Sequence, residues 1–138
     1  MTNQVELHPY YDQSKLLEFC KSLDITLTGY SPLGSLDSPF ASAEKNLLKE
    51  PVLEAIAKKH NKTVAQILIG WQVQRGAIVI PKSVTPSRIE ENSKVFDFQL
   101  SVEDMQEIAK LNQKDGRMIF FAADKIHPHF PIKDDVEF

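Results

Sequence analysis

Three short strand-like runs alternate with helical segments along this chain, and this alternation restricts the possible folds more than any other feature. The runs span residues 4–8, 25–30 and 77–80. In the first run, Val5 and Leu7 alternate with polar residues before Pro9 ends the strand. The third run is apolar throughout, which is typical of a strand covered on both faces. Strands that alternate with helices form right-handed parallel units, so the sequence predicts an α/β fold with a parallel sheet.

Five helices are expected between and after these runs. Their expected starts are Asp12, Pro51, Thr63, Thr85 and Ser101. Thr63 and Gln66 have the spacing of a capping box, in which each side chain satisfies a backbone N–H of the other residue. The first helix should bury the stripe Leu16, Leu17, Cys20 and Leu23, and the last should bury Met105, Ile108, Ala109 and either Leu111 or Asn112. Regular patterning ends after Gly116.

The length of the chain limits how much of a closed fold it can form. A closed parallel barrel needs eight strands and typically about 250 residues. With 138 residues, this chain is expected to hold about three of the eight units, together with an extra helix and a tail. Two apolar sheet edges would then be bare. We expect residues 1–116 to form the barrel part and residues 117–138 to form the tail.

The composition argues against several classes of partner. The formal net charge is −3 and the pI is about 5.8, so no global basic field favours nucleic acid or an anionic membrane. Cys20 is the single cysteine, and no run approaches the roughly 20 apolar residues of a membrane span. Residues 1–15 are too polar for a signal peptide, so we expect a reducing, cytoplasmic setting. His60, His127 and His129 are too scattered for a zinc site, and no metal is expected.

The segment from residue 80 to residue 92 has the chemistry of a phosphate site. Lys82 and Ser83 follow the third strand, and Arg88 falls in the first turn of the helix that comes next. In an α/β barrel the C-terminal ends of the strands carry the site, and a helix N-terminus adds unpaired N–H groups. Lysine and arginine together suit a phosphomonoester. The pattern alone leaves open the alternative that both are solvated surface charges beside an ordinary helix start.

Two further positions lie at the ends of the other predicted strands. Tyr30 ends the second strand and could offer its ring to a flat heterocycle, while the loop after it offers hydroxyls and N–H groups to phosphates. A core tyrosine beside an ordinary turn is the alternative. Gln4, in the first strand, could pair with another amide or could be structural.

Residues 3–10, residues 29–35 and residues 80–83 resemble the sixth, seventh and eighth strand signatures of aldo-keto reductases. Arg88, Glu91 and Asn92 extend the last signature, and the order and spacing agree. The similarity continues through residues 59–66 and 94–98 to about Leu111, and it is closest to the aldose and aldehyde reductase branch. The resemblance implies the last three β/α units of a (β/α)8 TIM barrel with a C-terminal extra helix and tail.

The resemblance also implies NADPH as the cofactor and a role for each matching residue. Tyr30 would stack on the nicotinamide and Gln4 would bond its carboxamide. The pyrophosphate would lie along Ser31, Leu33, Ser35 and Asp37. The 2'-phosphate would be held by Lys82, Ser83 and Arg88, and the adenine by Glu91 and Asn92. NADPH should be preferred to NADH, since two fixed cations would have no anion to neutralise in NADH.

The catalytic residues of that family have no counterpart here. The family reduces aldehydes and ketones to alcohols by hydride transfer, and its catalytic tyrosine, lysine, histidine and aspartate lie on the first four units. We therefore expect no catalytic residue in this chain and no activity from it alone. His8 before Pro9 is more simply structural. The tail, with Phe120, Phe121, Phe130 and residues 127–129, lies where the family has its substrate-selecting loop, and a merely structural or loosely ordered tail is the alternative.

Several explanations of the short length stay open. The chain could be part of a longer oxidoreductase that takes a small carbonyl substrate. It could instead be a catalytically silent NADPH-binding or structural module, as in a lens crystallin, or a barrel completed by a partner segment. In each case the bare sheet edges predict self-association or pairing with a complementing segment.

Overall fold

The computed structural model of the protein describes residues 1–35 and 45–119. Its elements follow in the order β1 (Thr2–Glu6), α1 (Ser14–Ser22), β2 (Thr26–Tyr30), the 3-10 helix η1 (Leu47–Lys49), α2 (Pro51–His60), α3 (Val64–Gln74), β3 (Ile78–Val79), α4 (Pro86–Ser93) and α5 (Val102–Ala109). The expected strands and helices are all present, so the predicted α/β fold is confirmed.

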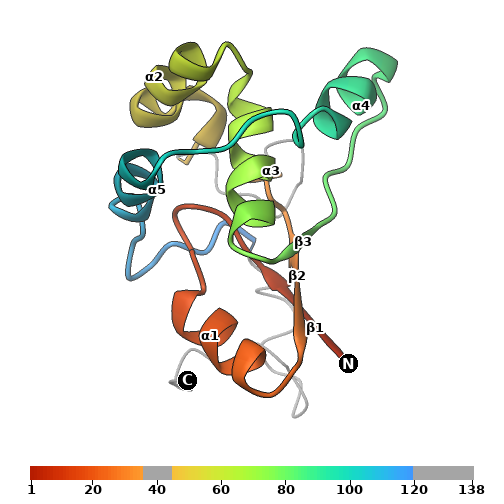
Figure 1. Ribbon diagram of the computed structural model, residues 1–138, viewed down its shortest axis with the longest axis vertical. Helices are drawn as coiled ribbons and strands as arrows, with labels where there is room; N and C mark the ends of the chain where they lie inside the picture. The colour runs from red at the N-terminus through yellow and green to blue at the C-terminus, as the bar shows by residue number, and fades with distance from the viewer. Residues whose placement is uncertain (36–44, 120–138) are drawn as a thin grey trace.

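The three strands form one parallel sheet in the order β1-β2-β3 (Figure 1). β1 pairs with β2 along its whole length, which sets Glu6 beside Tyr30. β3 pairs with β2 only at Thr28 and Gly29. Because parallel strands end at the same edge of the sheet, the loop after β2 and the segment after β3 leave from that edge together.

The helices bury two apolar clusters around the sheet. One joins α2, α3 and α5 through residues such as Leu53, Trp71 and Ile108, and the other packs α1 against β1 and β2. In Figure 1, α2, α3 and α5 gather on one side, and α1 lies at the opposite end of the molecule from α4. The segments that carry the predicted site residues therefore extend from the part of the fold that these two clusters hold together.

Capping boxes occur at two of the helix starts expected from the sequence. Thr63 Oγ1 accepts from the Gln66 N–H at 3.3 Å, and Gln66 Oε1 accepts from the Thr63 N–H at 3.0 Å. An equivalent box joins Ser101 and Asp104 at the start of α5. Asp12 does not cap α1 as predicted. The N-cap is Gln13, with a left-handed φ of 52°, and the Asp12 carboxylate accepts from the Ser14 N–H instead.

Four burial predictions are wrong. Leu23 is 55% exposed because α1 ends at Ser22, and Ala109 is exposed at the end of α5. Ile78 and Ile80 are 50% and 45% exposed, although the apolar run had indicated a strand covered on both faces. β3 is the edge strand of this sheet, so its outer side has no neighbouring strand among the described residues. On α5, Ile108 is buried, and the partly buried residue near its end is Leu111 rather than Asn112.

Within residues 1–35 and 45–119, no helix combines the length and the apolar character that a bilayer crossing requires.

Candidate functional site

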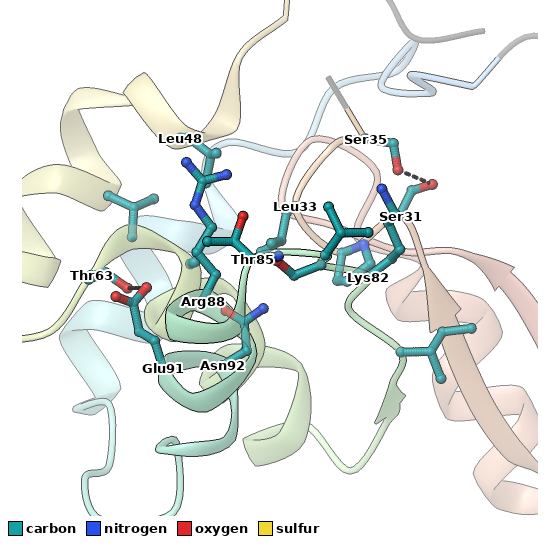
Figure 2. Close-up of a pocket in the computed structure, with 16 residues that line it drawn as sticks. Ser31, Leu33, Ser35, Leu48, Thr63, Lys82, Thr85, Arg88, Glu91 and Asn92 are labelled. Carbon is teal, nitrogen blue, oxygen red and sulfur yellow. Dashed lines mark hydrogen bonds between the residues drawn. The ribbon is translucent and has the colours of Figure 1, made fainter. Parts of the chain in front are cut away.

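A cavity of about 670 Å³ opens at the C-terminal edge of the sheet (Figure 2). Its volume falls within the range of about 300–1,000 Å³ that is usual for small-molecule and cofactor sites. Eight of the residues predicted from the sequence line it, namely Ser31, Leu33, Ser35, Lys82, Ser83, Arg88, Glu91 and Asn92. The fold thus brings the loop after β2 and the segment after β3 to one place.

The loop after β2 has an unusual backbone. Ser31 and Ser35 have left-handed φ values of 51° and 49°, and Gly34 has a φ of 84°. The Gly34 N–H donates to the Ser31 carbonyl at 3.0 Å, and Ser35 Oγ donates to Ser31 Oγ at 2.9 Å (Figure 2). Non-glycine residues in this region are strained, and such residues concentrate at functional sites. The loop is therefore a tight turn that faces the cavity with two hydroxyl groups.

Lys82 and Arg88 bring two positive charges to the cavity wall (Figure 2). Both are exposed, and among the described residues neither has a carboxylate within ion-pair distance or a hydrogen-bond partner. α4 begins beside them, and its N-cap Thr85 makes no side-chain capping bond. The two cations and the uncapped helix start give this part of the wall a positive field, although the carboxylate of Glu91 lies on the same helix.

Glu91 and Asn92 lie on α4, and Glu91 also fastens this helix to α3. Glu91 Oε1 accepts from Thr63 Oγ1 at 2.8 Å (Figure 2). The Glu91 carbonyl accepts from Gln66 Nε2 at 3.0 Å. Gln66 Nε2 also donates to the carbonyl of Lys94, just after α4. These bonds hold α4, which carries Arg88, in place against α3.

One wall of the cavity was not predicted from the sequence. That wall is formed by Thr63, Val64 and Ala65 at the start of α3, with Leu48 of η1 nearby. The capping box had located this helix start correctly, but its position beside α4 depends on packing between distant segments. The extended similarity over residues 59–66 was the one signal that could have indicated it.

Among the described residues, two predicted site residues, Tyr30 and Gln4, are not in the cavity lining. Tyr30 is half-buried at the end of β2, and burial, reinforced by the negative charge of Glu6, raises the pKa of its phenol above the usual range. The phenol is therefore protonated at neutral pH. Gln4 is exposed on β1, where it pairs with Thr28. Asp37 lies outside the described residues, as does the tail from residue 120 onward.

His8 is completely buried, and its Nε2 lies 2.9 Å from Glu6 Oε1. This placement agrees with the structural role expected for it. Among the described residues, no group of three or more His, Cys, Asp or Glu could hold a metal ion. His127 and His129 lie outside the described residues.

Parallel strands followed by helices, with a cavity at their C-terminal ends, are the features of part of an α/β barrel. A sequence model described as the Aldo/keto reductase family matches residues 1–113, and the chain belongs to this family. It is 49% identical to "Aldo-keto reductase family 1 member A1-A" of Danio rerio over 142 residues, which cover 95% of this chain and 43% of that protein. It is 51% identical to "Aldo-keto reductase family 1 member C15" of Rattus norvegicus, over 96% of this chain and 41% of that protein.

The fold comparison agrees with the sequence comparison. The crystal structure of Gox0644 in its apo form matches with a TM-score of 0.75 and 43% identity, over 85% of this chain and 40% of that one. The chain thus spans about two fifths of the length of these relatives. Its fold is a partial (β/α)8 barrel, as the sequence predicted.

Proposed function

We propose that the cavity binds the adenosine end of NADPH and that the chain supplies the cofactor-binding part of an aldo-keto reductase. Such an oxidoreductase would reduce aldehydes or ketones to alcohols. The main support is the pair Lys82 and Arg88, two cations that line one cavity and form no ion pair among the described residues. A phosphate would neutralise both.

The 2'-phosphate would be held by Lys82, Ser83 and Arg88. Arginine offers a planar fork of donors and lysine a compact point charge, so the pair suits a phosphate dianion. NADH carries a hydroxyl at this position, and both charges would remain unneutralised. The arrangement therefore favours NADPH over NADH.

The rest of the adenosine end would follow the cavity walls. Ser31 and Ser35 would bond the pyrophosphate, with Leu33 beside it and Asp37 as a further expected contact. Glu91 and Asn92 would bind the adenine, and Val64 and Ala65 line the cavity from the facing helix with apolar surface. This division fits a ligand with a charged end and a flat aromatic end.

The nicotinamide would lie beyond the cavity, near Tyr30 and Gln4. The raised pKa keeps the Tyr30 phenol neutral, so its ring would pack on the nicotinamide without adding a negative charge. Bound NADPH supplies the hydride that reduces the carbonyl carbon, and the carbonyl oxygen must take up a proton. The Tyr10 hydroxyl is engaged with Glu50 at 2.5 Å, and Tyr11 accepts from Arg117. We assign no proton donor here and propose that the chain alone gives no turnover.

The bare sheet edges support a proposal about partners. The half-exposed side chains of Ile78 and Ile80 lie at the β3 edge, and β1 forms the other edge of the sheet. Unpaired strands with apolar side chains readily pair with further strands. We propose that the chain associates with itself or with a complementing barrel segment. The reducing, cytoplasmic setting expected from the lone Cys20 stays a prediction.

The decisive experiment is a titration of the chain with NADPH and NADH, followed by tyrosine and tryptophan fluorescence. NADPH should bind more tightly, and Lys82→Ala/Arg88→Ala should remove that preference, because removing each charged hydrogen bond to the phosphate weakens binding by roughly 10-fold or more. The matched control is Lys58→Ala/Lys114→Ala, which removes two exposed lysines that do not line the cavity.

Adenosine 2',5'-bisphosphate serves as a second ligand in the same assay. It carries the 2'-phosphate and the adenine but lacks the nicotinamide, so it should compete with NADPH if the adenosine end is held by this chain. Equal binding of NADPH and NADH, or an unchanged preference in the Lys82/Arg88 variant, would refute the proposed function.

A further inference from the structure

The buried carboxylate of Glu6 collects hydrogen bonds from a distant part of the chain. Glu6 is 3% exposed, and its Oε1 accepts from the Met118 N–H at 2.6 Å and from the Ile119 N–H at 3.1 Å. His8 Nε2 lies 2.9 Å from the same oxygen. One carboxylate oxygen at the end of β1 therefore holds the backbone that follows α5. We call this set of contacts the Glu6 anchor, comprising Glu6, Met118 and Ile119.

The anchored segment also approaches the loop after β1 closely at other points. The Gln113 N–H donates to the Tyr10 carbonyl at 3.0 Å. Gly116 passes so near that a Cβ there would lie 1.6 Å from the Tyr10 carbonyl oxygen. Arg117 donates to the Tyr11 hydroxyl at 3.3 Å. The path from residue 113 to residue 119 is therefore closely determined by Glu6 at the end of β1 and by the loop that follows β1.

Met118 also contacts the loop after β2 that lines the cavity. Its side chain is fully buried in the cluster that includes Leu47, and partly buried Leu33 packs against that cluster. A Cβ on Gly34 would lie 3.0 Å from Met118 Cε and 3.2 Å from Met118 Sδ. The side chain thus packs against the turn whose left-handed backbone at Ser31 and Ser35 shapes the cavity.

We propose that Glu6 is a positioning residue that couples the cavity loop, residues 31–35, to the segment that begins the C-terminal tail. Glu6 holds the Met118 backbone, and the Met118 side chain supports Gly34. A change at the loop therefore acts on the start of the tail, and a change at the tail acts on the loop. The part of this inference that concerns NADPH rests on the proposed function, whereas the coupling itself does not.

Backbone amide hydrogen exchange of the ligand-free chain tests the coupling directly. Glu6→Gln keeps the size of the side chain but removes its charge, so the Met118 and Ile119 amides should exchange about 10-fold faster or more. The Gly34 amide, bonded to the Ser31 carbonyl, should also exchange faster because its support has loosened. The Leu68 amide in α3 serves as the internal reference for global unfolding. Glu54→Gln, an exposed glutamate on α2, is the matched control.

Exchange at the individual amides distinguishes the Glu6 anchor from its coupling to the cavity loop. No change at Met118 and Ile119 would overturn the anchor, and faster exchange there with an unchanged Gly34 amide would overturn the coupling. If Glu6→Gln does not fold, Glu6→Asp keeps the charge but retracts the oxygen, and it should accelerate the same three amides. NADPH added to the unsubstituted chain should slow exchange at Met118 and Ile119. Binding without that effect would count against the coupling, whereas a lack of binding would refute only the proposed function.

Discussion

Asp104 provides a quantitative test of how α5 is attached to the fold. Its side chain is 6% exposed and lies 2.8 Å from Lys59 Nζ and 2.7 Å from His60 Nε2, both on α2. Burial alone would raise the pKa of Asp104, but hydrogen bonds, chiefly from Lys59 and His60, outweigh burial and hold this pKa well below its usual range. The ionised carboxylate is therefore the stable form in the fold.

Asp104→Asn keeps an acceptor for the Ser101 N–H but removes the charge. A hydrogen bond to a charged group contributes roughly 1.5–3 kcal/mol. The Lys59 side chain is 55% exposed, so water screens its share, and the His60 contact dominates. We expect the substitution to lower the free energy of unfolding by about 2–3 kcal/mol near neutral pH.

The effect should depend on pH in a defined direction. A carboxyl group whose pKa is depressed in the fold contributes stability that is complete above its unfolded pKa, about 3.9. That contribution is lost as the pH falls through the folded pKa. The difference between the unsubstituted chain and Asp104→Asn should therefore be largest above about pH 5 and shrink below about pH 4. Urea unfolding followed by circular dichroism at several pH values measures this difference.

The matched control is Asp97→Asn. Asp97 also pairs with a lysine, Lys62, at 2.6 Å, but its side chain is 63% exposed. An exposed pair is screened by water and salt, so its loss should matter much less than the loss of Asp104. Equal losses in the two variants, or an Asp104→Asn difference that persists unchanged in acid, would refute this reasoning.

Three further predictions concern the sheet, the cavity wall and association. Gly29→Ala should destabilise the fold by roughly 2–4 kcal/mol, measured by thermal unfolding, because the new methyl group overpacks the core and displaces a buried hydrogen bond. The displaced group is Gln72, whose Oε1 would lie 2.5 Å from the new Cβ. Thr63→Val should lower stability by about 1 kcal/mol and weaken NADPH binding several-fold, since Glu91 loses its tie to α3. Light-scattering chromatography should show self-associated species, and charged substitutions at Ile78 and Ile80 should reduce them.

Each of these three predictions has a control variant or a result that would contradict it. Gly70→Ala in α3 meets only the far end of the Phe98 ring, at 2.9 Å, and gains helix propensity, so it should cost much less than Gly29→Ala. Ser101→Ala removes the cap of α5 without touching the cavity, so it should lower stability and leave NADPH affinity unchanged. A sharp monomer peak for the unsubstituted chain would disprove the association.

Local patterns in the sequence predicted the order of elements and most of the cavity. Alternation of strands and helices sufficed for the parallel sheet, because right-handed crossovers leave few other arrangements. Residues placed at strand ends meet at one edge of such a sheet, which is why the loop at residues 31–35 and the segment at residues 80–85 face the same cavity. The proposed boundary at residue 116 stays a prediction.

What the sequence could not predict depends on contacts between distant residues. The Glu6 anchor joins positions 112 and 113 residues apart, and no local pattern encodes such a pairing. The exposure of Ile78 and Ile80 was not predicted because an apolar run indicates only that a strand is suited to burial. Whether the strand is buried depends on which neighbouring elements this chain contains. The N-cap of α1 is Gln13, one residue after Asp12, and no local sequence pattern indicated the left-handed backbone of Gln13.

The two ends of the proposed cofactor site differ in how much they depend on the rest of a barrel. Arg88 and Glu91 are positioned by contacts within this chain, because they lie on α4 and hydrogen bonds join α4 to Thr63 and Gln66. Tyr30 and Gln4 lie on strands whose remaining neighbours in a closed barrel would be other units. The adenosine end is therefore the part whose geometry this chain can hold alone. Hydride transfer would require both ends at once, which is why we expect binding of the adenosine phosphates without turnover.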